Sequence, residues 1–285
     1  VNHAPACGLI DARSKAGIYR ATGPGVESLY LGHVRSERSI IAMQWDILAT
    51  ILLTATIQSL FGVGVLLFGT PILLVLGYDF ITALTILLPI SLTINLLQVS
   101  KDYRHVQVPF YRQVLTLSIP CVVLCLLLVT TLKLNIGSIV GLFLIVAALK
   151  SIYVPFNRLI ESLVRYERTY FIVMGVVHGL TNLGGSLLTA IIHSKQYDKD
   201  QTRATTALSY GTFALFQLVT LGISLGPSAI ATSDTALYMA VGVSMFLATE
   251  LLLYSKMSTE RYRTTFAAFL FLSGTALIFK SLFLR

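Results

Sequence analysis

The chain has 285 residues, of which 55% are hydrophobic and only 12% are charged. Its mean hydropathy of +0.79 is too high for a soluble domain of this size, so the composition excludes a soluble globular protein. The formal net charge of +8 comes from basic residues that lie between apolar segments, so it reports orientation in a membrane and excludes a nucleic-acid partner.

Residues 1–42 differ from the rest of the chain. They contain basic residues, glycines and prolines, but no apolar run that is long enough to serve as a signal peptide or a membrane anchor. We expect the biological start to be Met43, with residues 1–42 as an over-extended reading frame. A disordered N-terminal tail is the alternative.

The remaining chain, 43–285, is expected to form one transmembrane domain. About 20 apolar residues cross a bilayer as a helix, and uninterrupted spans are predicted over 79–97, 113–131, 135–152, 204–222, 233–254 and 264–281. Glycines interrupt two further apolar stretches, 46–76 and 169–192. Isolated strands cannot pair their backbone groups in lipid, and no segment alternates with a period of two residues. The predicted fold class is therefore an all-α membrane protein.

The basic residues of the loops predict how the spans are oriented. The loops 98–112, 153–168 and 255–263 each carry three Lys or Arg residues, whereas 223–232 carries none. Because cytoplasmic loops are enriched in Lys and Arg, the first three should be cytoplasmic and the last should face outward. The stretch 169–192 then begins and ends on the cytoplasmic side, before a charged loop over 193–203. It is too short to cross twice, so we predict a re-entrant hairpin of two half-helices.

The first half of the domain repeats this arrangement. An offset of 120 residues pairs Gln58 with His178 and Gly64 with Gly184. Each half, 43–152 and 169–285, is then a hairpin followed by three crossings, an odd number that gives the halves opposite orientations. Such inverted repeats, with broken helices that meet near the midplane, are typical of secondary transporters.

The two hairpin tips predict a binding site. Half-helix N-termini would direct free N–H groups and the positive ends of helix dipoles into a central cavity, which favours an anion. The candidate substrate-binding residues are the glycines of the tips and the polar side chains near them: Gln58, Gly62, Gly64, Asn95, His178, Thr181, Asn182, Gly184, Gly185 and Ser186. Close helix packing and hydrogen bonds between helices are the alternative roles for these residues.

Other polar residues are predicted to have structural roles. Gln98 lies near the end of its predicted span and should reach the membrane interface, and Glu250 should be an interfacial anchor. Cys121 and Cys125 lie one helical turn apart without a neighbouring His or acidic residue, so packing is favoured over metal binding.

Two segments carry a family resemblance. FGVGVLLFGTPILLVLG, over 61–77, and HGLTNLGGSLLTAII, over 178–192, resemble the two signatures of the sulfite exporter family, the TauE/SafE-type permeases (TSUP). The usual triple glycine is reduced to Gly62-Val-Gly64 and to Gly184-Gly185. The resemblance covers about 43–285. It implies proton- or gradient-coupled transport of small anions such as sulfite, sulfonates, thiosulfate or organic acids across the inner membrane of a bacterium.

Other classes of function stay open at this point. An anion channel is one alternative, and an intramembrane enzyme or assembly factor that uses His178 as a general base is another. An enzyme would need a partner for that His, yet the sequence has no HExxH or GxSxG motif and no acidic pair on one helix face. We therefore expect no catalytic residue, cofactor or metal. The expected partners are the bilayer, a small anion and a coupling proton, while transport direction and a homo-oligomer stay open.

Overall fold

The computed structural model describes residues 45–132, 166–227, 230 and 234–252. The chain divides into two units, Val1–Gln44 and Trp45–Arg285, and all described residues belong to the second unit. Every regular element among them is helical, as the sequence predicts. The N-terminal segment 1–42 and the spans predicted at 135–152 and 264–281 lie outside the described residues.

Among the described residues, four helices are long and apolar enough to cross a membrane. They are Phe80–His105, Val108–Leu132, Lys199–Leu225 and Thr235–Leu252. The first joins α3 (Phe80–Asp102) to a single 3₁₀ turn, η1 (Tyr103–His105); the second joins α4 (Val108–Gln113), a π-helical turn, η2 (Val114–Ser118), and α5 (Ile119–Leu132). The others are α10 (Lys199–Leu225) and α11 (Thr235–Leu252). These four confirm the spans predicted at 79–97, 113–131, 204–222 and 233–254.

Two pairs of shorter helices form the predicted hairpins. The first pair is Trp45–Phe61 and α2 (Val65–Leu76), and the second is α8 (Glu167–Thr181) and α9 (Gly185–Ser194). The first residue of each turn has a left-handed backbone conformation: Gly62 has φ 73° and Asn182 has φ 60°. Gly and Asn adopt this conformation with the least steric cost, and it ends a helix by turning the backbone away. The glycine-rich interruptions of the sequence are therefore the turns of the hairpins.

An aspartate caps the long helix that follows each hairpin. The Asp79 side chain accepts a hydrogen bond from the N–H of Thr82, and that of Asp198 accepts one from the N–H of Gln201. Such a cap satisfies a backbone N–H that has no partner within the helix. The two hairpins therefore lead into α3 and α10 through the same local structure.

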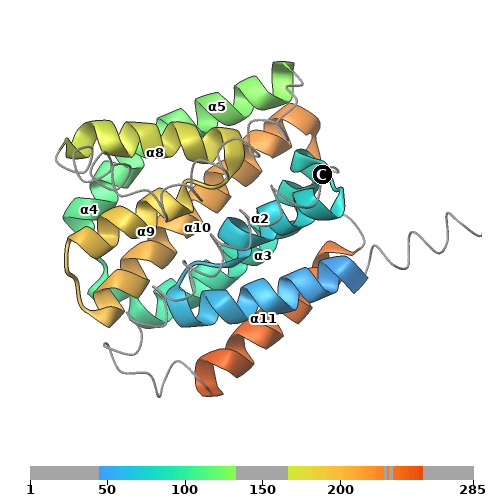
Figure 1. The fold of residues 1–285 in the computed structure, drawn as a ribbon, viewed down its shortest axis with the longest axis horizontal. Coiled ribbons are helices and arrows are strands. Elements are labelled where there is room, and N and C mark those ends of the chain that lie inside the picture. The colour runs from blue at the N-terminus through green and yellow to red at the C-terminus, as the bar shows by residue number, and fades with distance from the viewer. Residues whose placement is uncertain (1–44, 133–165, 228–229, 231–233, 253–285) are drawn as a thin grey trace, which may run out of the picture. The chain divides into compact units, whose positions relative to one another are not determined.

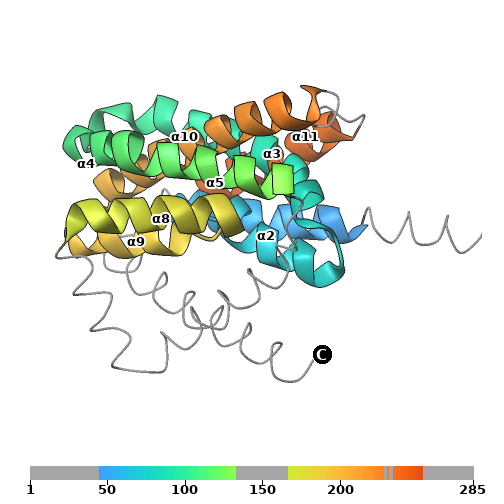
Figure 2. The same cartoon turned by 90° about the horizontal axis from the view of Figure 1, so that it is seen from above.

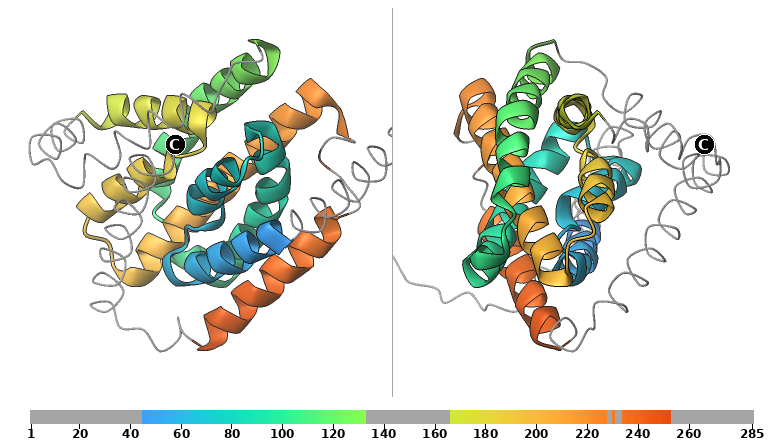
Figure 3. Two further views of the ribbon diagram at one scale, coloured as in Figure 1. Left: turned by 45° about the vertical axis from the view of Figure 1, so that its right-hand side comes forward. Right: turned by 90° about the vertical axis from the view of Figure 1, so that its left-hand side faces the viewer.

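The helices lie in two layers. The helix Trp45–Phe61, α2, α8 and α9 form one layer, and α3, α5, α10 and α11 form the other (Figures 1 and 2). The right-hand view of Figure 3 separates the same two layers. Helix α3 packs against α10 and α11, and α5 packs against α8 and α10. The hairpins therefore lie side by side on one face of the long helices.

Two glycines let α8 approach α5 closely. A Cβ atom on Gly175 would lie 2.5 Å from the carbonyl oxygen of Ser118, and one on Gly179 would lie 2.7 Å from that of Val122. The same Cβ atoms would contact Cys121 and Cys125, so these cysteines pack against the helix seam. Small residues four positions apart are typical of such contacts between membrane helices.

Candidate functional site

Gln58 holds the first hairpin tip against α3. Its Oε1 accepts a hydrogen bond of 2.9 Å from the N–H of Val65, the first residue of α2, and its Nε2 donates one of 2.9 Å to Oδ1 of Asn95. Asn95 in turn donates to Oγ of Ser91 at 3.1 Å. The structure thus brings together Gln58 and Asn95, two of the predicted site residues, through a buried hydrogen-bonded chain.

Gln98 belongs to the same buried group. Only 1% of its surface is exposed, and its Nε2 donates a hydrogen bond of 3.2 Å to the carbonyl oxygen of Gln58. The prediction that Gln98 reaches the interface is wrong, because α3 continues for another turn to Asp102.

His178 occupies the corresponding place in the second hairpin. Its Nε2 lies 3.3 Å from Oε1 of Gln217 on α10, and its ring lies 4.4 Å from that of Phe213. A hairpin residue and a glutamine of the next long helix are thus hydrogen-bonded at both tips. Nδ1 of His178 and Nε2 of Gln217 are buried and have no hydrogen-bond partner in the described part of the chain.

Asn182 links the second tip to the first hairpin. Its Nδ2 donates a hydrogen bond of 2.7 Å to Oγ1 of Thr70 on α2. Its Oδ1 is buried without a hydrogen-bond partner among the described residues. Thr181 and Ser186 shape the turn: the Thr181 hydroxyl accepts a hydrogen bond from the N–H of Leu183, and the Ser186 hydroxyl donates one to the carbonyl oxygen of Leu183.

Two of the predicted site glycines lie against their own hairpins. A Cβ atom on Gly64 would lie 2.5 Å from the nitrogen of Gln58, and one on Gly184 would lie 2.5 Å from Cβ of His178 and 2.8 Å from the carbonyl oxygen of Met174. Each contact is with the last turns of the helix that enters the tip. Both glycines therefore allow the chain to fold back at this point.

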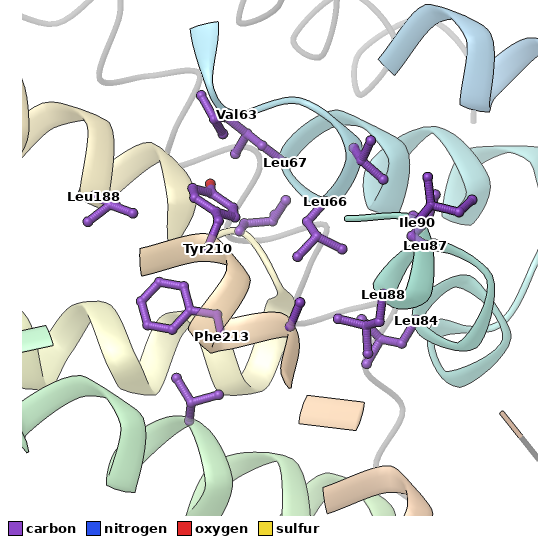
Figure 4. Close-up of a cluster of buried hydrophobic side chains, with 14 of the residues drawn as sticks. Val63, Leu66, Leu67, Leu84, Leu87, Leu88, Ile90, Leu188, Tyr210 and Phe213 are labelled. Atoms are coloured by element: carbon purple, nitrogen blue, oxygen red, sulfur yellow. The ribbon is translucent and has the colours of Figure 1, made fainter. Parts of the chain in front are cut away.

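The other two tip glycines face α10. A Cβ atom on Gly62 would lie 3.2 Å from Cγ of Arg203, and one on Gly185 would lie only 1.1 Å from the hydroxyl oxygen of Tyr210. Figure 4 shows the Tyr210 ring beside Val63 of the first tip and Leu188 of α9. Helix α10 therefore contributes polar side chains to both tips, Arg203 to the first and Tyr210 and Gln217 to the second.

Arg203 forms a buried ion-pair network that sequence reasoning missed. It is 1% exposed, and its guanidinium pairs with Asp102 at 3.2 Å and also with Glu250. Lys101 pairs with Glu250 at 3.0 Å. The network joins the end of α3, the start of α10 and the end of α11.

Two predictions for this region are wrong. The segment 193–203 is not all loop, because α9 ends at Ser194 and α10 already begins at Lys199. Glu250 is not an interfacial anchor, because it is buried beside Arg203. The pattern of an Asp three residues before a Gln at 198–201 is a capping box, and it could have located this helix start from the sequence.

A protein-family model matches the part of the chain that contains these hairpins. The family model described as Sulfite exporter TauE/SafE matches residues 47–277. The chain therefore belongs to this family. The TauE/SafE family consists of membrane transporters, and its model covers both hairpins and all four described spans. Neither the curated proteins nor the solved structures gave a match.

TauE/SafE membership is consistent with the positions of the two signature-like segments. Residues 61–77 run from the first tip through α2, and 178–192 run from the second tip into α9. Both segments therefore contain a hairpin turn and the N-terminus of a half-helix, the elements from which a transporter builds a site within the membrane.

Proposed function

We propose that this TauE/SafE protein is a secondary transporter that moves a small anion across the inner membrane of a bacterium with a proton as coupling ion. The substrate is a sulfur-containing anion, such as sulfite, a sulfonate or thiosulfate, or a small organic acid. The observation that carries the proposal is the contact of the second hairpin tip with α2 beside two buried half-helix N-termini. Helices α2 and α9 begin at the two buried tips, and the hydrogen bond from Asn182 to Thr70 joins the hairpins.

The charges near the tips favour an anion bound by dipoles and N–H groups. The dipole of an α-helix is positive at its first turn. At these tips several first-turn N–H groups already donate, that of Val65 to Gln58 and those of Leu187 and Leu188 to Gly184, so the dipoles are the main attraction. The cation near the first tip, Arg203, already pairs with Asp102 and Glu250. Its charge is balanced, so the half-helix N-termini supply the attraction.

The arrangement of α3 and α10 supports two inverted repeats, 43–152 and 169–285. Asp102 at the end of α3 pairs with Arg203 near the start of α10, while Asn95 contacts Gly211 further along α10. The two helices are therefore antiparallel, as an inverted repeat requires of equivalent helices. In each half a glutamine of the long helix is hydrogen-bonded to a hairpin residue: Gln98 to the carbonyl oxygen of Gln58, and Gln217 to the side chain of His178.

Flux measurements in proteoliposomes test this function. Purified protein should give saturable uptake of sulfite, thiosulfate, methanesulfonate or acetate, and an imposed pH gradient should change the rate. Current that does not saturate and ignores the pH gradient would favour an anion channel. Chemical conversion of the anion would favour an enzyme. No flux of any of these anions would contradict the proposal.

Labelling of single cysteines tests the predicted orientation. In a variant that lacks the native cysteines, Arg104→Cys and Ser194→Cys should react with an impermeant maleimide only after the membrane is opened. Leu76→Cys, at the end of α2 and just before α3 begins, should react in intact cells. All three positions are exposed in the structure. Reaction of Ser194→Cys in intact cells would exclude a hairpin that re-enters from the cytoplasm.

A further inference from the structure

Tyr210 is a buried tyrosine whose hydroxyl group has no visible role in the fold. The residue is 1% exposed, and within the described part of the chain its hydroxyl oxygen has no hydrogen-bond partner. A buried tyrosine hydroxyl usually forms a hydrogen bond, and an exception requires an explanation. Two other tyrosine hydroxyls have partners: that of buried Tyr170 donates to the carbonyl oxygen of Leu187, and that of half-buried Tyr111 lies 3.0 Å from the hydroxyl of Thr212.

Aromatic packing fixes the ring of Tyr210. It lies edge-on to His178 with 6.1 Å between ring centroids, and edge-on to Phe213 at 6.0 Å. The ring stands among apolar side chains, with Val63, Leu67 and Leu188 around it (Figure 4). Packing of the ring thus holds the hydroxyl in place, without a hydrogen bond to any of the described residues.

The hydroxyl lies at the N-terminus of α9. A Cβ atom on Gly185, the first residue of that helix, would lie 1.1 Å from the oxygen, so only glycine leaves room for it. Leu67 and Val63 belong to α2 and to the turn before it, so the same ring also borders the other half-helix. A donor without a partner among the described residues is therefore placed where α9 begins, on a ring that borders α2.

We propose that Tyr210 donates a hydrogen bond to the transported anion at the N-terminus of α9. This inference rests on the proposed function. A hydroxyl bonded to an anion forms a short, charge-assisted hydrogen bond. The N–H groups of Ser186, Leu187 and Leu188 already donate to Leu183 and Gly184, so α9 adds the positive end of its dipole. Gly185 then has a specific purpose, because any side chain there would displace the hydroxyl from the end of the helix.

Binding measurements on the purified full chain test the inference. Affinities for sulfite, thiosulfate and methanesulfonate are measured by calorimetry in detergent, together with melting temperatures in the absence of anion. Tyr210→Phe should weaken binding roughly tenfold to a hundredfold, as expected for one hydrogen bond to a charged group. Its melting temperature should equal or exceed that of the wild type, because the lost hydroxyl has no partner in the described part of the chain. Tyr111→Phe, the matched control, should keep wild-type affinity.

The outcomes separate this inference from the proposed function. Wild-type protein that binds none of the three anions, and no acetate when that is added to the panel, would contradict the proposed function. Wild-type affinity in Tyr210→Phe, with binding intact in the wild type, would overturn the role of Tyr210 alone and assign the hydroxyl to a structural water. A large fall in the melting temperature of Tyr210→Phe would also overturn it, because the hydroxyl would then have a partner within the fold.

Discussion

Replacing Arg203 with methionine should destabilise the folded protein by about 3–5 kcal/mol, the usual cost of removing one partner from a buried ion pair. The variant leaves the carboxylates of Asp102 and Glu250 near each other without the guanidinium that lies between them. Lys101 cannot replace it, because Lys101 contacts Glu250 from the surface, with 60% of its side chain exposed. Denaturant unfolding of the purified protein in detergent measures the change.

A matched control comes from an exposed ion pair. Lys195 and Glu167 form a salt bridge in which each side chain is 33% exposed. Lys195→Met should therefore cost less than about 1 kcal/mol. Adding Glu250→Gln to Arg203→Met should recover part of the loss, since it removes one of the two unpaired charges. Equal stability of Arg203→Met and Lys195→Met would show that the network contributes nothing to folding.

Gly64→Ala and Gly184→Ala should each destabilise the protein by about 3 kcal/mol, the upper end of the usual range for overpacking. At both positions the added Cβ atom would meet the preceding half-helix at 2.5 Å, and the hairpin would have to open. Because the two glycines occupy equivalent places, the losses should be similar. Gly222→Ala is the control, since its Cβ atom would meet only a side-chain atom of Ile230 at 3.4 Å. Melting temperatures in detergent measure all three.

The opposite result would be equally informative. Suppose that Gly64→Ala and Gly184→Ala melted like Gly222→Ala but bound anions weakly. The two glycines would then border the ligand, and their close contacts with the preceding helices would not be needed for stability. Unequal losses at the two positions would argue against equivalent hairpins.

Sequence reasoning found the hairpins because their signals are local. Glycines interrupt apolar runs of membrane length, and the loop charges predict that the second run returns to its side of entry. Span ends were less predictable. A hydropathy pattern ends where charged residues begin, whereas α10 begins before Arg203 and buries it. Its partners, Asp102 and Glu250, are distant in the sequence, so no local pattern could reveal the pairing.

The candidate site shows the same limit. The polar residues Gln58, His178 and Asn182 were noticeable because they interrupt apolar segments, and the structure places each of them at a tip. Tyr210 gave no such signal, since an aromatic residue in an apolar helix usually belongs to the core. Only its position against Gly185 and its unpartnered hydroxyl distinguish it.

The close seam between α8 and α5 limits how the transporter can change its accessibility from one side of the membrane to the other. Gly175 and Gly179 bring α8, the first helix of the second hairpin, against α5 from the first half of the chain. Gly242 of α11 packs against Ile51 in Trp45–Phe61, the first helix of the first hairpin. Each half is thus interlocked with the other. A rocking motion of one half against the other would have to break both seams. We therefore expect that α2 and α9, the second helices of the two hairpins, move during alternating access, while the other helices keep their contacts with one another.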